Sequence, residues 1–222
     1  MTAEMLSQLV TKVNRNIRRF NLQISRGPTE TDGTVYYALI NTADNEITRL
    51  SNHWSQKELL YFRRLVSAII ESRNGTISST KALNTGREDD LKFTMTSAES
   101  LINKWVEQKW LEEINDGSLA IGVRTLLEMN VYIREYFEVQ DCFRCKTLCI
   151  RGSNCVSCDI KLHFHCVDSQ FIPQNKCPNC GKQFTTTSER LSAASDDDTE
   201  EDTEEDEEVV QQNQRSKRSK RI

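Results

Sequence analysis

Apolar residues recur at helical and strand spacing through the first part of the chain. Near the start they stand four and three residues apart, which predicts an amphipathic helix over about 3–20. The apolar positions are Leu6, Val10, Val13, Ile17 and Phe20. Two strand-like runs follow at 22–25 and 34–40, with Gly27-Pro28 and Asp32-Gly33 between them. Because such residues favour turns, the two runs predict a β-hairpin.

A second series of elements is predicted from Ser55 onward. Ser55 and Glu58 have the spacing of a capping box, which predicts the start of an apolar-faced helix that ends near Gly75. An extended segment near Ile77 and a brief helix over 79–84 come next. The apolar face of the longer helix is made of Leu59, Phe62, Leu65, Val66, Ile69 and Ile70.

Another helix, a hairpin and a final helix complete this series. Thr96 and Glu99 predict a second capping box, at the start of a helix whose apolar face includes Trp105. The runs 110–114 and 119–121 then predict a hairpin with Asp116-Gly117 as a two-residue turn. A last helix is expected over 123–137.

This order of elements is that of a winged-helix module. Helix, short strand, helix, helix and hairpin fit it over 55–122, whereas 1–41 resembles only the last helix and wing of another. The helix before the wing usually enters a DNA groove. Here 97–109 has balanced charges, which argues against tight phosphate contact. Its exposed face is more compatible with protein, while Trp105 and Trp110 fit simple core positions.

Eight ligand-type residues near the C-terminal end form four pairs, each with two residues between its members. Such a pair can place both side chains on one ion, and four pairs suit two tetrahedral zinc sites. The short gaps between pairs leave little room for a hydrophobic core, so each zinc would contribute about 10–16 kcal/mol to folding. The pairs are Cys142 with Cys145, Cys155 with Cys158, His163 with Cys166, and Cys177 with Cys180.

Spacing alone leaves two ways to join the pairs. Sequential pairing would give two separate sites, whereas interleaved pairing would join the first pair to the third and the second to the fourth. The four-residue gap between Cys158 and His163 is short for independent loops, which favours the interleaved, cross-brace form. Four protein ligands would close each site, so we expect two structural zinc ions and no catalytic residue.

Two residues near these pairs have competing interpretations. His165 is adjacent to Cys166 and would strain a chelate, so His163 is the preferred ligand. Cys149 fits no pair, and its apolar neighbours indicate a buried thiol. Disulfides are the alternative for eight cysteines, but no apolar core with a cleavage site occurs over 1–20, which argues against a secreted chain.

The last thirty residues change in composition. Eleven acidic residues lie between Ser195 and Glu208, and five basic residues follow within 215–221, so a disordered tail is expected. The basic cluster favours nuclear import, with a plain solvated tail as the alternative. Ser195, Thr199 and Thr203 lie among the acids, where acidophilic kinases could phosphorylate them.

Net charge and hydropathy argue against two properties, tight nucleic-acid binding and a membrane span. The whole chain has 29 basic and 33 acidic residues. Without the tail's five basic and eleven acidic residues, 24 basic and 22 acidic residues remain. The rest of the chain is therefore nearly neutral, which predicts weak or absent nucleic-acid binding. No stretch approaches the roughly 20 apolar residues of a membrane span.

Four motifs in order resemble the non-structural maintenance of chromosomes element one family. They are the cysteine and histidine spacing, RGPTETDGTVYYALIN from Arg26, ESLINKWVEQKWLEE from Glu99, and LLEMNVYIREYF from Leu126. The resemblance implies two winged-helix domains and a variant RING in a nuclear, chromatin-associated subunit of the SMC five-six complex, which acts in DNA repair. It also implies a MAGE-family partner, a kleisin partner and ubiquitin ligase activity.

The expected fold class is therefore α+β, with a winged helix and a two-zinc RING-like module. We expect a truncated first winged helix over 1–50, a second over 51–138, the RING-like module over 139–184 and a disordered tail over 185–222.

A RING positions a charged ubiquitin-conjugating enzyme and contributes no nucleophile. By the resemblance, Phe143, Arg144 and Pro178 would contact that enzyme and Lys182 would face ubiquitin. Arg144 stands where RING ligases often have an apolar residue, and Gly181 where they often have a basic one. These departures favour a second hypothesis, a non-catalytic scaffold.

A histone reader of the PHD type is a third hypothesis. The ligand order would suit it, but Asn175 occupies the position where such readers usually have tryptophan. A methyl-lysine pocket would then lack an aromatic wall.

Overall fold

The computed structural model describes residues 2–42, 54–167 and 176–184. These residues belong to one compact unit, Met1–Ser188. The expected disordered tail, with Ser195, Thr199 and Thr203, lies outside the described residues, as does the expected boundary near 50. Within the described residues, no helix is both long and apolar enough to cross a membrane.

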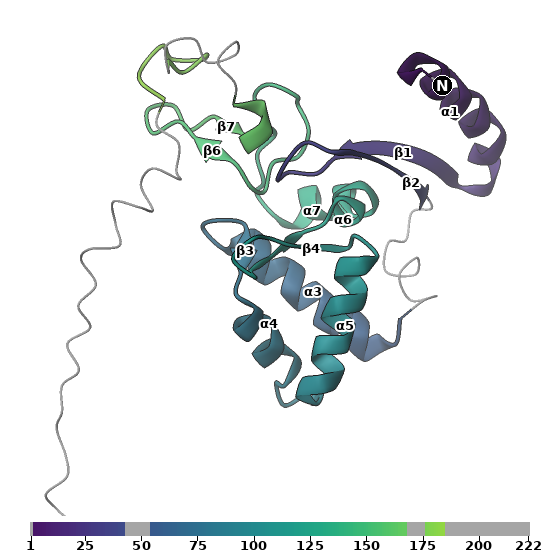
Figure 1. Ribbon diagram of the computed structural model, residues 1–222, viewed down its shortest axis with the longest axis vertical. Helices are drawn as coiled ribbons and strands as arrows, with labels where there is room; N and C mark the ends of the chain where they lie inside the picture. The colour runs from purple at the N-terminus through teal and green to yellow at the C-terminus, as the bar shows by residue number, and fades with distance from the viewer. Residues whose placement is uncertain (1, 43–53, 168–175, 185–222) are drawn as a thin grey trace, which may run out of the picture. The chain divides into compact units, whose positions relative to one another are not determined.

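The first helix and hairpin are present with different bounds (Figure 1). Helix α1 (Ala3–Ile17) is capped by Thr2 and passes into a 3-10 turn, η1 (Arg18–Phe20). Strands β1 (Leu22–Pro28) and β2 (Val35–Asn41) pair antiparallel. The expectation that Gly27 and Pro28 lie in the turn is wrong, since both pair with β2. Proline is tolerated there because β1 is an edge strand of a two-stranded sheet.

Hydrogen bonds close the loop between β1 and β2. Thr29 N–H donates to the Thr34 carbonyl over 2.9 Å, and Thr34 N–H donates to the Asp32 carboxylate over 2.9 Å. Hydrogen bonds from the Thr29 and Thr34 side chains lower the pKa of Asp32 to about 2. The loop is therefore an ordered element that can present other side chains at fixed positions.

The second series follows the expected order. Helix α3 (Gln56–Glu71) begins with the predicted capping box of Ser55 and Glu58, which is confirmed. Strand β3 (Thr76–Ile77) and the helices α4 (Ser79–Gly86) and α5 (Met95–Glu107) follow. Strands β4 (Leu111–Glu113) and β5 (Leu119–Ile121) complete a sheet of order β3-β5-β4.

Three local expectations in this series are wrong. Helix α5 is capped by Thr94, whose Oγ1 accepts from Ser97 N–H, so Thr96 lies inside the first turn and forms no capping box. The β4–β5 loop spans three residues, 115–117, because Ile114 N–H pairs with the Ser118 carbonyl and Gly117 takes φ +76°. The expected helix 123–137 divides at Met129 into α6 (Val123–Glu128) and α7 (Asn130–Tyr136).

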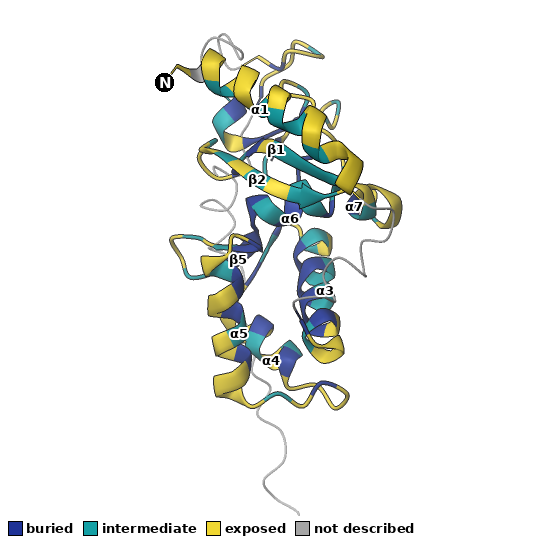
Figure 2. Ribbon diagram, turned by 90° about the vertical axis from the view of Figure 1, so that its right-hand side faces the viewer, coloured by how far each residue is buried: buried dark blue, intermediate teal, exposed yellow. Residues whose placement is uncertain are grey.

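An aromatic core lies between the helices and this sheet. The inward faces of α3, α4 and α5 are buried, while their outer faces are exposed (Figure 2). Trp105 and Trp110 are 0% and 3% exposed, which confirms that they are core residues. Trp54 and Phe62 pack against both tryptophans, with ring centroids 4.9–5.8 Å apart across the group.

The C-terminal described segment has little regular structure. It contains the two-residue strands β6 (Ser153–Asn154) and β7 (Lys161–Leu162) and a 3-10 turn, η2 (Phe164–Cys166). Its interior consists mainly of cysteines, with Leu162 and Phe184 as buried apolar side chains. This small core is what the short gaps between ligand pairs predict.

Candidate metal centres

The structure brings the eight predicted ligands together in two clusters of four. Within each cluster the ligand atoms all lie within 4.8 Å of one another, a span that one ion can bridge. The first and third pairs share one cluster, and the second and fourth share the other, which is the interleaved arrangement. The histidine-containing cluster consists of Cys142, Cys145, His163 and Cys166; the all-cysteine cluster consists of Cys155, Cys158, Cys177 and Cys180.

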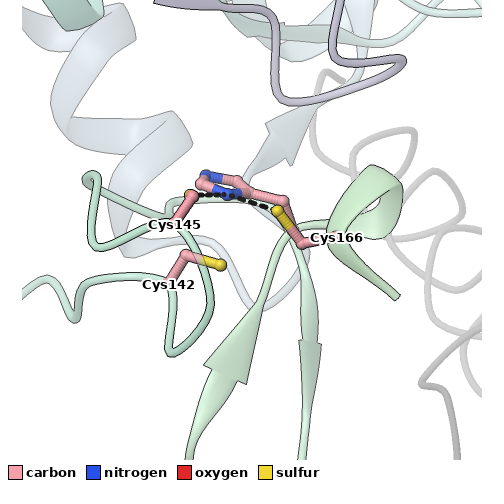
Figure 3. Close-up of side chains that lie close together, drawn as sticks. Cys142, Cys145 and Cys166 are labelled. Atoms are coloured by element: carbon pink, nitrogen blue, oxygen red, sulfur yellow. Dashed lines mark hydrogen bonds between the residues drawn. The ribbon is translucent and has the colours of Figure 1, made fainter. Parts of the chain in front are cut away.

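In the histidine-containing cluster, the cysteine sulfurs lie close to one nitrogen of the histidine ring. Figure 3 shows Cys142, Cys145 and Cys166 on neighbouring segments with their sulfurs facing a common space. His163 Nδ1 lies 3.3 Å from Cys145 Sγ and 3.9 Å from Cys166 Sγ. Zinc with thiolate at about 2.3 Å and imidazole at about 2.05 Å in tetrahedral geometry would separate these atoms by about 3.6 Å.

The all-cysteine cluster has matching dimensions. Cys155 Sγ lies 3.7 Å from Cys180 Sγ, and Cys158 Sγ lies 3.6 Å from Cys177 Sγ. Four sulfurs at about 2.3 Å from a tetrahedral zinc would be about 3.8 Å apart. All eight cysteines are free, and these separations are far longer than an S–S bond of about 2.05 Å.

The same backbone turn supports each Cys-x2-Cys pair. The residue after the second cysteine donates its N–H to the carbonyl of the first, over 2.8–2.9 Å. That residue has positive φ in each pair: Lys146 at 59°, Asp159 at 57° and Gly181 at 70°. The left-handed conformation turns the chain so that both sulfurs face one side, and Gly181 adopts it without the steric cost that Lys146 and Asp159 bear.

The cluster thiols have pKa values shifted in opposite directions from the ordinary value of a cysteine. Burial raises the pKa of Cys166, and burial raises the pKa of Cys177 to about 12. A hydrogen bond from the Asn179 side chain lowers the pKa of Cys158 to about 6. A bound cation strongly favours thiolate over thiol. A metal would therefore change the protonation of Cys166 and Cys177, whose pKa values are raised, more than that of Cys158.

The tautomer of His163 also suits a metal ligand. Its Nε2 lies 3.0 Å from the Leu148 carbonyl, which can only accept, so Nε2 carries the proton. Nδ1 then has a free lone pair facing the cysteines. Four protein ligands would close the site, which suits a structural role.

Comparison with known proteins identifies the family. The family profile described as Nse1, non-SMC component of the SMC5-6 complex, matches residues 1–129, more than half of the chain. The chain belongs to the Nse1 family. This membership confirms the family resemblance carried by the four sequence motifs.

Relatives of the Nse1 family match most of the chain. The chain is 34% identical over 184 residues to the Homo sapiens non-structural maintenance of chromosomes element 1 homolog, covering 81% of this chain and 69% of the human protein. The Mus musculus homolog is 33% identical with the same coverage. The Drosophila melanogaster homolog is 23% identical over 193 residues, covering 84% and 81%.

A solved structure has a similar fold. A chain of a structure described as the Nse1-Nse3-Nse4 complex superposes with a TM-score of 0.71 and 31% sequence identity. The match covers 83% of this chain and 81% of that chain. The Nse1-family fold therefore extends beyond the segment matched by the family profile.

His165 and Cys149 lie outside both clusters in this Nse1-family chain. The His165 ring stacks on His163 at 5.0 Å, and its Nδ1 faces the Glu30 carbonyl over 3.4 Å. Cys149 is fully buried, its thiol donates to the Arg151 carbonyl, and burial raises its pKa. A buried thiol with a raised pKa has low reactivity.

The four candidate contacts for a conjugating enzyme lie beside the metal ligands. Phe143 is half-buried, with Lys146 Nζ 4.3 Å from its ring centroid. Arg144, Pro178 and Lys182 are exposed, and Arg144 donates to the Cys166 carbonyl over 3.1 Å.

Sequence reasoning missed three residues near the metal clusters. Val156 and Phe164 are 61% and 37% exposed, so the module has apolar surface beyond Phe143. Glu30, from the distant β1–β2 loop, is buried against the segment that carries the two clusters. Its presence inside the RGPTETDGTVYYALIN stretch was the available signal, but spacing could not assign it a contact.

Proposed function

We propose that this Nse1-family chain is a RING-type ubiquitin ligase subunit of an SMC5-6 complex. The observation that carries the proposal is the interleaving of two four-ligand clusters, which resembles a RING cross-brace. Cysteine and histidine donors at these spacings suit zinc in preference to magnesium or calcium, which prefer oxygen. Two zinc ions would hold the module together, and neither would have an open position for catalysis.

The remaining described elements support two partner-docking modules. The order α3, β3, α4, α5, β4, β5 is that of a winged helix, and α1 with β1 and β2 corresponds to the last helix and wing of another. We assign the domains as 1–50, 51–138 and 139–184, followed by a tail over 185–222. The exposed Lys104 on α5 and Lys109 just after it are offset by the exposed Glu99 and Glu107 on α5, so this face favours protein over DNA.

The proposed assembly follows from the similar solved complex. That complex contains Nse3 and Nse4, so we propose a MAGE-family partner and a kleisin partner for this chain. Such an assembly would act in DNA repair on chromatin in the nucleus. Ligase activity would depend on the MAGE-family partner, because this chain departs from common RING ligases at Arg144 and Gly181.

The proposed ligase mechanism is positioning. The module would hold a charged conjugating enzyme so that its thioester faces a substrate lysine, which raises the effective concentration of the reactants. Phe143, Arg144 and Pro178 would contact the enzyme, and Lys182 would contact ubiquitin. These four contact assignments are supported by the location of the residues on the turns that hold the two clusters.

A non-catalytic scaffold is the second candidate. The Arg144 guanidinium bonds to the Cys166 carbonyl where an apolar contact is usual in a ligase, and Gly181 takes φ +70° for the turn. Both residues have a structural use within the module. Zinc would then stabilise an assembly surface without engaging a conjugating enzyme.

Autoubiquitination separates the two candidates. The full chain would be assayed with and without a MAGE-family partner across a panel of conjugating enzymes, after two zinc ions per chain are confirmed by native mass spectrometry. A Phe143→Ala/Arg144→Ala double variant should lose at least tenfold in rate, since interface anchors often cost over 1.4 kcal/mol. Val131→Ala, exposed on α7, is the matched control.

The outcomes are distinct. Activity that requires Phe143 and Arg144 but not Val131 supports the ligase. No activity in any combination, with both zinc ions bound and the partner complex intact, supports the scaffold.

A further inference from the structure

Glu30 is a buried acid far in sequence from the metal ligands. It lies in the β1–β2 loop and is 2% exposed. Among the buried residues of the described chain, it is the only carboxylate. Burial of a carboxylate is unfavourable unless its oxygens are hydrogen-bonded, so its contacts indicate its role.

The Glu30 carboxylate bonds to the segment next to the histidine-containing cluster. One oxygen, Oε1, accepts from Ile150 N–H over 2.6 Å, and Oε2 accepts from Arg151 N–H over 3.2 Å. Oε1 also lies 3.4 Å from His163 Nε2. The same nitrogen donates to the Leu148 carbonyl over 3.0 Å, so the imidazole faces both acceptors.

Other contacts hold the loop against this segment. Arg151 donates to Thr31 Oγ1 over 2.8 Å, and His165 Nδ1 lies 3.4 Å from the Glu30 carbonyl. Gly33 approaches the same histidine so closely that a Cβ would lie 2.9 Å from His165 Cγ. These contacts place Glu30 at a fixed position relative to His163.

We propose that Glu30 is a positioning residue for the histidine-containing cluster. Its carboxylate fixes the backbone of residues 148–151, where the Leu148 carbonyl accepts from His163 Nε2–H. The negative charge of Glu30 faces that same imidazole N–H. Nδ1 is thereby directed at the cysteines and made a stronger donor, as carboxylates do for metal-bound histidines. This inference rests on the proposed metal binding.

A separate metal site at Glu30 is the competing interpretation. Glu30, Cys149 and His163 also have ligand atoms within 4.8 Å of one another. However, His163 Nε2 carries a proton toward Leu148, and both Glu30 oxygens accept backbone N–H groups. No lone pair of His163 remains for a third ion once Nδ1 serves the histidine-containing cluster.

Cobalt titration of the metal-free full chain tests the role of Glu30. Cobalt bound by three thiolates and an imidazole absorbs visible light differently from cobalt bound by four thiolates, so each site is followed separately. Glu30→Gln keeps the size of the side chain but removes its charge. It should weaken the histidine-containing site about 10–100-fold, while the all-cysteine site changes less than about twofold. Thr31→Val, which removes the Arg151 side-chain contact but keeps both backbone hydrogen bonds to the Glu30 carboxylate, is the matched control and should weaken the histidine-containing site much less than Glu30→Gln does.

Three results would overturn the proposal. They are an unchanged affinity of the histidine-containing site in Glu30→Gln, an equal loss at both sites, and an equal effect of Thr31→Val. Failure of the unsubstituted chain to bind cobalt at either site would reject the metal binding itself.

A second measurement needs no variant. In the zinc-loaded chain with nitrogen-15-labelled histidine, NMR should show His163 with metal on Nδ1 and a proton on Nε2. Metal on Nε2 would place the ion on the Glu30 side and overturn the proposal.

Discussion

At the scale of single residues, the cysteines differ in what they contribute. Cys149 is buried and its thiol donates to the Arg151 carbonyl, whereas the seven paired cysteines and His163 converge in two groups. The convergence depends on every ligand, since a structural zinc site needs four donors. Substitution of a single cluster cysteine should therefore show whether the cysteine binds metal or is only buried.

Cys155→Ala tests this dependence. The all-cysteine site would keep three ligands and should lose its zinc, leaving one ion per chain on the histidine-containing site or none if the module unfolds. Native mass spectrometry and limited proteolysis measure the two effects. Cys149→Ala is the control and should keep both ions; two ions and full protease resistance in Cys155→Ala would show that the metal assignment is wrong.

At the scale of elements, local sequence signals predict that a helix is present more accurately than they predict its first residue. Both Thr94 and Thr96 are acceptable caps by type, and Glu99 stands three residues after Thr96. The structure uses Thr94, which has extended dihedral angles and accepts from Ser97 N–H over 3.1 Å. Thr96 therefore makes no capping contribution.

Paired substitutions measure that difference. Thr94→Ala should lower the free energy of unfolding by about 0.5–2 kcal/mol, while Thr96→Ala should change it by less than about 0.5 kcal/mol. Urea denaturation followed by circular dichroism gives both values. A larger loss in Thr96→Ala would place the start of α5 two residues later.

At the scale of the compact unit, the β1–β2 loop joins the N-terminal hairpin to the cysteine-rich segment that carries the two clusters. Figure 1 shows this loop reaching the segment that carries β6 and β7. Gly33 is one point of close approach, with the His165 ring against it. The N-terminal hairpin and the metal centre should therefore depend on each other for stability.

Gly33 and Gly117 offer a matched test of this contact. Both have φ +76°, but a Cβ on Gly117 would meet nothing within 4 Å, whereas one on Gly33 would meet His165. Gly117→Ala should cost only the left-handed backbone term, about 1–2 kcal/mol. Gly33→Ala should cost more in urea denaturation and also increase hydrogen exchange at the Ile150 and Arg151 amides; equal costs with unchanged exchange would show that the loop is not docked.

The chain sequence by itself determined that the helices and hairpins are present and that the candidate ligands form four pairs. Apolar spacing located the core, including Trp105 and Trp110, because burial imposes a period on any helix. The two-residue spacing within each pair predicted the candidate ligands, because it lets two side chains on one turn face the same ion. Helix starts, turn lengths and the break at Met129 were less accurate, since several local hydrogen-bond patterns have similar free energies there.

Only the tertiary structure decided which distant groups meet. Glu30 and His163 are 133 residues apart, and no periodicity relates them. Their contact depends on how the hairpin packs against the cysteine-rich segment, because hydrogen bonds form between neighbours in space. The interleaved grouping of the ligand pairs was favoured by one short gap, and the fold of the intervening turns brings it about.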